Sequence, residues 1–162
     1  MRVFLSWSGK RSKKVARKLR GWLPKMFRNL EIWMSDRDIR IGERWSPELL
    51  RQIDRAQFAI LCLTTDNLES PWIHFEAGAI AKSVGDKTFV APYLIDIKKS
   101  AIPGPLKQFQ AARATKKGTW RLVHSLALAL NPRRKSLRPL EERFEELWPL
   151  LKKSIKKVKR AG

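Results

Sequence analysis

One carboxylate stands in the middle of the most apolar segment of the chain, SPWIHFEAGAI at residues 70–80. A serine followed by a proline is a common start for a helix, and a helix that is apolar on every side is usually buried. Glu76 is the only acidic residue of the segment, and Trp72, four residues earlier, shares its helical face. The residues by themselves favour an ion pair between Glu76 and one of the 35 Lys and Arg residues, with a catalytic carboxylate as the alternative.

Two further segments that could carry chemistry lie at the ends of predicted strands. FLSWSG at residues 4–9 ends the first strand, and the polar SDRDIRIGERW at residues 35–45 follows the second. The helix that carries Glu76 comes after the third. Because ligands of parallel α/β sheets bind at the carboxyl ends of the strands, we expect the three segments to meet at one edge. Residues 8–10, Ser-Gly-Lys, are candidates to face a phosphate at the first turn between strand and helix.

The elements that must position these segments alternate between strand and helix. Short apolar runs predict strands at residues 2–6, 31–34, 57–63 and 88–95. Helical spacing and Ser-Pro starts predict helices at residues 10–27, from residue 46 and from residue 70. This alternation indicates a parallel sheet with helices on both faces. We therefore predict an α/β fold, a flavodoxin-like open parallel sheet of about five strands flanked by helices, with a C-terminal helical extension.

The chain beyond residue 95 is mostly helical. The predicted elements are a loop with one helical turn, an edge strand and two helices, at residues 102–109, 109–114, 120–130 and 137–158. The last helix is amphipathic and very basic at its end, and NPRRKSLRP before it resembles a linker. We expect two parts: a domain at residues 1–132, and a C-terminal helix at residues 133–162 that packs on it or extends from it.

Composition narrows the class of protein. The 35 Lys and Arg against 15 Asp and Glu give a formal net charge of +20, a field that attracts nucleic acids, nucleotides and anionic lipid. Cys62 is the single cysteine and lies in an apolar run, so it reads as a buried structural thiol and no internal disulfide is possible. No apolar run is long enough for a membrane span, and the start does not read as a signal peptide. We expect a cytoplasmic protein.

Several common catalytic motifs are absent from the sequence. The turn after the first strand is neither a dinucleotide-binding glycine motif nor a P-loop. His74 and His124 have no partners at metal-ligand spacing, and no nucleophile elbow is present. These observations argue against a serine hydrolase or a zinc enzyme, and no metal site is expected.

The three strand-end segments resemble the three boxes of the Toll/interleukin-1 receptor (TIR) domain, especially its stand-alone bacterial branch. The matching residues are Phe4, Ser6 and Trp7 in the first box, Asp36, Asp38, Ile41 and Gly42 in the second, and Trp72 and Glu76 in the third. The match covers residues 1–95. This sequence departs from the usual boxes in Trp7 for Tyr, Ile41 for Pro and Ile73 for Cys.

The resemblance implies an enzyme that cleaves the nicotinamide–ribose bond of NAD+, an NAD+ nucleosidase or ADP-ribosyl cyclase, with Glu76 as the catalytic residue. NAD+ is then the substrate and no cofactor is needed. The candidate substrate-binding residues are Phe4, Ser6, Trp7, Ser8, Asp36, Arg40, Trp45 and Trp72. The alternatives are a core position for Phe4, plain solvated charge for Asp36 and Arg40, and a contact that fixes the next helix for Trp45.

The resemblance also implies partners and a setting. It suggests bacterial antiviral defence, self-association through the loop at residues 35–45, and an activator or effector protein. The rival functions are a non-catalytic TIR scaffold, a nucleic-acid-binding module supported by charge alone, and an enzyme like the nucleoside deoxyribosyltransferases, which shares the layout and the N-glycosidic chemistry.

Overall fold

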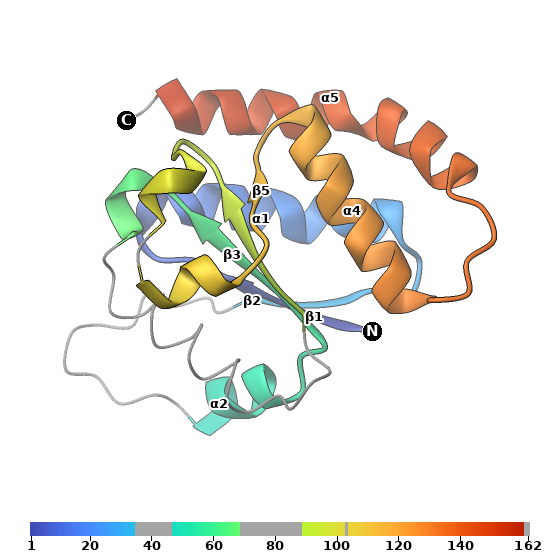
Figure 1. Cartoon of the computed structure of the whole chain (residues 1–162), viewed down its shortest axis with the longest axis horizontal. Helices are drawn as coiled ribbons and strands as arrows, with labels where there is room; N and C mark the ends of the chain where they lie inside the picture. Colours follow the sequence, from blue (N-terminus) through green and yellow to red (C-terminus); the bar gives the residue numbers. More distant parts are fainter. Residues whose placement is uncertain (35–46, 69–88, 103, 161–162) are drawn as a thin grey trace.

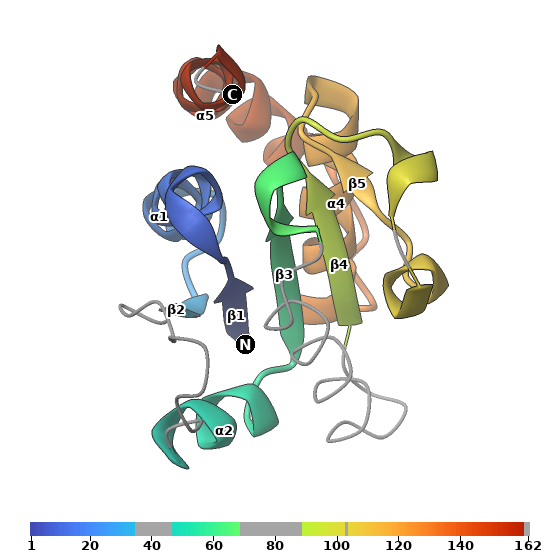
Figure 2. The same cartoon turned by 90° about the vertical axis from the view of Figure 1, so that its left-hand side faces the viewer.

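The computed structural model describes residues 1–34, 47–68, 89–102 and 104–160. In these residues five strands form one sheet in the order β2-β1-β3-β4-β5, and all four pairs are parallel. The strands are β1 Arg2–Ser6, β2 Glu31–Met34, β3 Phe58–Leu63, β4 Phe89–Leu94 and β5 Ala112–Arg113. Figure 2 shows β1, β3 and β4 pointing the same way. The predicted α/β class, strand count and flavodoxin-like order are confirmed.

Helices connect the strands and close the chain (Figure 1). They are α1 Gly9–Met26, α2 Pro47–Asp54, α4 Lys116–Leu130 and α5 Arg138–Arg160, with short 3₁₀ turns η1 Thr65–Asn67, η2 Lys99–Ala101 and η3 Gly104–Gln108. The predicted helix from residue 70 lies outside the described residues.

The start of α4 corrects the sequence-based prediction, which placed it at residue 120. The helix begins at Lys116 because the Thr115 side chain accepts a hydrogen bond from the Gly118 backbone N–H at 3.2 Å. Gly118 is required here, since a Cβ at this position would lie 2.1 Å from the Arg113 carbonyl oxygen. Glycine has a low helix propensity, so a prediction from propensity starts this helix too late. Glycine is nevertheless required at residue 118, because the Arg113 backbone lies too close for a side chain.

The sheet separates the core into two clusters, one on each face. Val3 and Leu5 of β1 pack with α1, α4 and α5, whereas Phe4 packs on the other face with Ile53 of α2 and Leu106 of η3. Successive side chains of a strand point to opposite faces, so this division follows from the strand pattern. All six residues of β3 are buried, as its unbroken apolar run predicts.

Cys62 lies in β3 and is buried, in agreement with its reading as a structural thiol. Burial raises the pKa of its thiol to about 12, so almost no reactive thiolate is present at neutral pH.

The C-terminal helix α5 packs on α1 and α4 through an aromatic cluster. Phe144 is 1% exposed, and its ring centroid lies 6.0 Å from that of Trp22, 5.2 Å from Trp120 and 5.8 Å from Trp148. The Trp22 indole N–H also donates to the Leu147 carbonyl oxygen at 2.8 Å. Trp120 and Trp148 therefore pack helices together, as predicted, while the division of the chain at residue 132 stays a prediction. No helix in the described ranges is both long and apolar enough to cross a membrane.

The aromatic cluster should hold α5 in place. Replacing Phe144 by Ala removes a buried ring that contacts three helices, and we expect the free energy of unfolding to fall by about 3–5 kcal/mol. Urea denaturation followed by tryptophan fluorescence measures it. The matched control is Leu150→Ala on the same helix, where the side chain is 58% exposed and the expected change is within about 0.5 kcal/mol. Equal losses in the two variants would contradict this packing.

Candidate active site at the carboxyl edge of the sheet

The strand order changes direction between β1 and β3. From β1 the chain moves outward to β2 on one side, and it then returns to β3 on the other side. Ser6, the last residue of β1, pairs with Leu61 of β3. The carboxyl ends of these two strands therefore flank the position at which open parallel sheets usually bind ligands.

The turn after β1 is held in place by Asn67. The Asn67 side-chain amide donates to the Ser8 carbonyl oxygen at 3.1 Å and to the Cys62 carbonyl oxygen at 3.0 Å, and its side-chain oxygen accepts from the Thr64 N–H at 2.8 Å. Asn67 is 2% exposed, so these bonds form in a protected environment. They fix the turn after β1 against the end of β3.

The same turn leads directly into α1. Gly9 has φ +80°, a backbone conformation that glycine adopts without strain. The Ser12 hydroxyl accepts from the Ser8 N–H at 3.0 Å and donates to the Ser8 carbonyl oxygen at 2.5 Å. The Ser8 amide is thus already bonded within the protein, and the predicted contact of residues 8–10 with a phosphate stays a prediction.

Arg11 joins the carboxyl edge to both terminal helices. Its guanidinium lies 2.9 Å from Asp66 and 3.2 Å from the Thr65 hydroxyl, forms an ion pair with Asp96, and donates twice to the Val158 carbonyl oxygen at 3.3 Å. The side chains of Arg11 and Asp96 are only 12% and 15% exposed. Burial alone would lower the pKa of Arg11, but its hydrogen bonds and attraction to Asp96 and Asp66 leave it raised.

The two aromatic residues of β1 and the following turn belong to different core clusters. Phe4 is 1% exposed and stacks on Trp33 of β2, with ring centroids 5.3 Å apart and planes 17° apart. Ser6 lies two residues further along β1, on the same face as Phe4. Trp7 packs in the cluster on the α1 side, where the Lys13 ammonium lies 4.1 Å from its ring centroid in a cation–π contact.

Comparison with known families identifies the family of this chain. The family model for the TIR domain matches residues 3–126, more than half of the chain. The chain belongs to the TIR-domain family.

The chain is similar to the TIR domains of the activated Roq1 resistosome directly recognizing the pathogen effector XopQ, at 19% sequence identity and a TM-score of 0.47. The match covers 99% of this chain and 98% of that chain. A comparison with curated proteins gives no match.

The structure describes only part of the predicted site of this TIR domain. It places Phe4 and Ser6 together on one face of the sheet and Ser8 at the adjoining turn. Trp7 is not brought together with them, because it is 3% exposed and packs in the cluster on the other face. The other predicted site residues lie outside the described residues: Asp36, Arg40, Trp45, Trp72 and Glu76. Their roles stay predictions. In the described ranges, no three His, Cys, Asp or Glu residues cluster closely enough to hold a metal ion.

Sequence reasoning missed the side chains that fix this edge of the TIR domain, namely Arg11, Asn67 and Asp96. The asparagine had a local signal, because an Asn just after a buried strand commonly bonds to nearby backbone. Arg11 and Asp96 had none, because they are 85 residues apart and meet only through the strand order.

Arg11 should be important for stability. Replacing it by Met leaves Asp96 without its cation in a partly buried place, and we expect the free energy of unfolding to fall by about 3 kcal/mol. Urea denaturation measures this change. Arg17→Met removes the same charge from an exposed position of α1 and should change stability by about 0.5 kcal/mol or less. If the double variant Arg11→Met, Asp96→Asn is as unstable as the sum of the two single variants, the ion pair is not coupled as described.

Proposed function

We propose that this TIR domain is an NAD+ nucleosidase that cleaves the nicotinamide–ribose bond with Glu76 as its catalytic residue. The observation that supports it is membership of the TIR-domain family in a chain that carries Trp72 and Glu76 of the third box. The segment with these residues follows β3, and β3 ends beside the turn after β1, where the strand order changes.

The chemistry needs little from the protein. Nicotinamide leaves the pyridinium form of NAD+ as a neutral molecule, so no general acid is required, unlike ordinary glycoside hydrolysis with its two carboxylates. Positive charge develops on the ribose as the bond breaks. One fixed carboxylate in a water-poor site stabilises that charge, or binds the ribose hydroxyls and holds the substrate in a reactive pose. Glu76 is proposed for this role.

The other site residues are proposed to bind the substrate. Trp72 packs on the ribose or nicotinamide from the same helical face as Glu76. Phe4 and Ser6 contribute from the end of β1, where Phe4 is already held by Trp33. Asp36, Arg40 and Trp45 contribute from the loop after β2, with Trp7 and Ser8 at the turn after β1.

The product depends on the nucleophile that reaches the anomeric carbon. Water gives ADP-ribose and releases one proton, whereas a group of the substrate itself gives a cyclised ADP-ribose. NAD+ is the substrate, and neither a metal nor a cofactor is invoked. The proposed setting is cytoplasmic signalling in bacterial antiviral defence, after self-association through the loop at residues 35–45 or with an activator protein.

The catalytic role is tested by nicotinamide release. Glu76→Gln keeps the shape of the side chain but removes its charge, so we expect release from NAD+ to fall at least about 100-fold. Chromatography of the reaction at high protein concentration measures it. The control Glu146→Gln makes the same change at an exposed position of α5 and should retain activity within about twofold of the wild type.

Three outcomes would exclude Glu76 as the catalyst or favour another function. Unchanged turnover in the Glu76→Gln variant would exclude this residue as the catalyst. No release from either protein would favour a scaffold, or an enzyme that awaits its activator. Release of base from deoxynucleosides but not from NAD+ would favour the deoxyribosyltransferase-like alternative.

Self-association should depend on salt. A formal charge of +20 on each copy opposes contact between copies, and raising the ionic strength from 0.1 to 1 M shortens the Debye length from about 10 to about 3 Å. We therefore expect the average mass measured by light scattering to rise with salt. A fall in mass over this range would contradict the prediction and indicate that opposite charges join the copies.

A further inference from the structure

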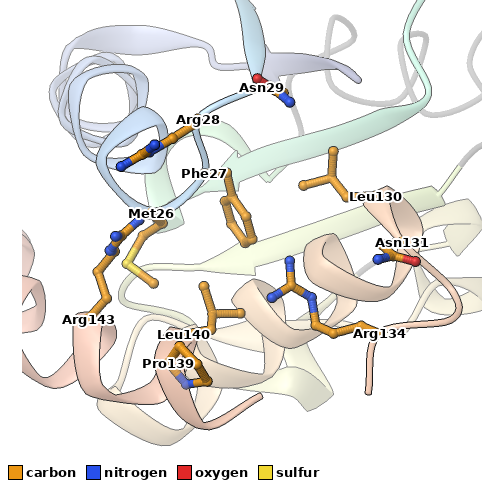
Figure 3. Close-up of a pocket in the computed structure, with 10 residues that line it drawn as sticks. All are labelled: Met26, Phe27, Arg28, Asn29, Leu130, Asn131, Arg134, Pro139, Leu140 and Arg143. Atoms are coloured by element: carbon orange, nitrogen blue, oxygen red, sulfur yellow. The ribbon is translucent and has the colours of Figure 1, made fainter. Parts of the chain in front are cut away.

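A pocket of about 350 Å³ opens between the ends of three helices, as Figure 3 shows. Its wall is formed by the C-terminal end of α1, the C-terminal end of α4 and the start of α5. The segment after α1 leads into β2 and α4 ends beside it, so this pocket lies at the amino edge of the sheet, opposite to the candidate active site. Nothing in the proposed NAD+ chemistry uses it.

The pocket is apolar on one part of its wall and cationic on the rest. Met26, Phe27 and Leu140 supply apolar surface. Arg28, Arg134 and Arg143 also line it, and no acidic residue does so in the described part of the chain. Three positive charges on one wall without a carboxylate favour the binding of an anion.

Two acidic residues of α5 that lie near this region in the sequence pair with cations outside the pocket wall. Glu142 pairs with Arg138 at 3.2 Å, and Glu145 pairs with Lys116 at 2.6 Å. Within the described ranges no ion pair involves Arg28, Arg134 or Arg143. The charge of the three arginines is therefore available to a ligand.

Besides the cationic wall, an unpaired donor of Arg134 points to a ligand. Its Nε is fully buried and has no hydrogen-bond partner among the described residues. A buried donor that lacks an acceptor is costly, and among the described residues one other arginine Nε, that of Arg2, is in the same state. In Figure 3 the Arg134 side chain extends from its loop toward Phe27 and Leu140.

The loop before α5 holds Arg134 in position. The Arg134 backbone N–H donates to the Asn131 carbonyl oxygen at 3.1 Å, and the Asn131 side chain accepts from the Arg133 N–H at 3.1 Å. This turn places Arg134 at the pocket, whereas Arg133 beside it is exposed and does not line it. A fixed backbone at this position lowers the entropy that anion binding would cost.

We propose that this pocket binds a small organic phosphate. The phosphate accepts hydrogen bonds from Arg134, whose planar fork matches two phosphate oxygens, and is neutralised further by Arg28 and Arg143. The apolar part of the ligand packs on Met26, Phe27 and Leu140. The volume falls in the range of small-molecule sites and suits a molecule of mononucleotide size.

Calorimetry with AMP as the probe tests the proposal. We expect AMP to bind the wild type, and adenosine, which lacks the phosphate, to bind at least tenfold more weakly. Arg134→Gln should weaken AMP binding at least tenfold. The matched control is Arg133→Gln, which removes the same charge from the neighbouring exposed position and should bind AMP within about twofold of the wild type.

Each of three results would overturn the proposal. The first is no heat of binding with AMP or inorganic phosphate at millimolar concentration. The second is AMP binding that Arg134→Gln leaves intact, because the ligand would then occupy another site, such as the candidate NAD+ site. The third is equal weakening by the two variants, as expected when the basic surface attracts any polyanion, including an oligonucleotide. If Arg134→Gln does not fold, the exposed Arg143→Gln replaces it with the same expected loss.

Discussion

The carboxyl edge of this TIR domain depends on one partly buried cation. Arg11 is placed by the first turns of α1, and it binds the segment after β3 through Asp66, the segment after β4 through Asp96 and the end of α5 through Val158. These contacts span up to 147 residues of sequence. A guanidinium suits the position because it has five donors in fixed directions and stays charged when partly buried. The strand ends that flank the candidate active site are thereby fixed relative to one another.

The two edges of the sheet differ in how the charge of their arginines is neutralised. With 35 Lys and Arg against 15 Asp and Glu, most cations have no carboxylate partner available. At the carboxyl edge, Asp66 and Asp96 neutralise Arg11. At the amino edge, Arg28, Arg134 and Arg143 surround a pocket that no acidic residue lines in the described part of the chain. Arginine charge is therefore neutralised at the carboxyl edge, where it fixes the strand ends, and is not neutralised at the pocket of the amino edge, where we propose that a ligand binds.

Local pattern predicted most of the described fold. The first four strands were placed within one residue of their observed ends, because short apolar runs bounded by polar turns have few other readings. The edge strand was predicted too long, at residues 109–114, whereas β5 is only Ala112–Arg113. The start of α4 was wrong, since the close approach of Gly118 to Arg113 cannot be read from propensity. The polar network around Arg11 and the pocket at Arg134 depend on contacts between distant segments, which no local pattern encodes. NPRRKSLRP resembled a linker because the place of Arg134 at the pocket is set only when three helix ends come together.

The packing of α5 on α1 has a consequence for synthesis of the protein. Trp22 lies in the first helix, but its hydrogen-bond acceptor Leu147 follows 125 residues later. At about 5–20 residues per second, a ribosome needs about 6–25 s to travel that distance. During this interval the part of α1 that packs on α5, which includes Trp22, is not covered by its final partner. A chain still on the ribosome therefore exposes this part of the helix until α5 has been made.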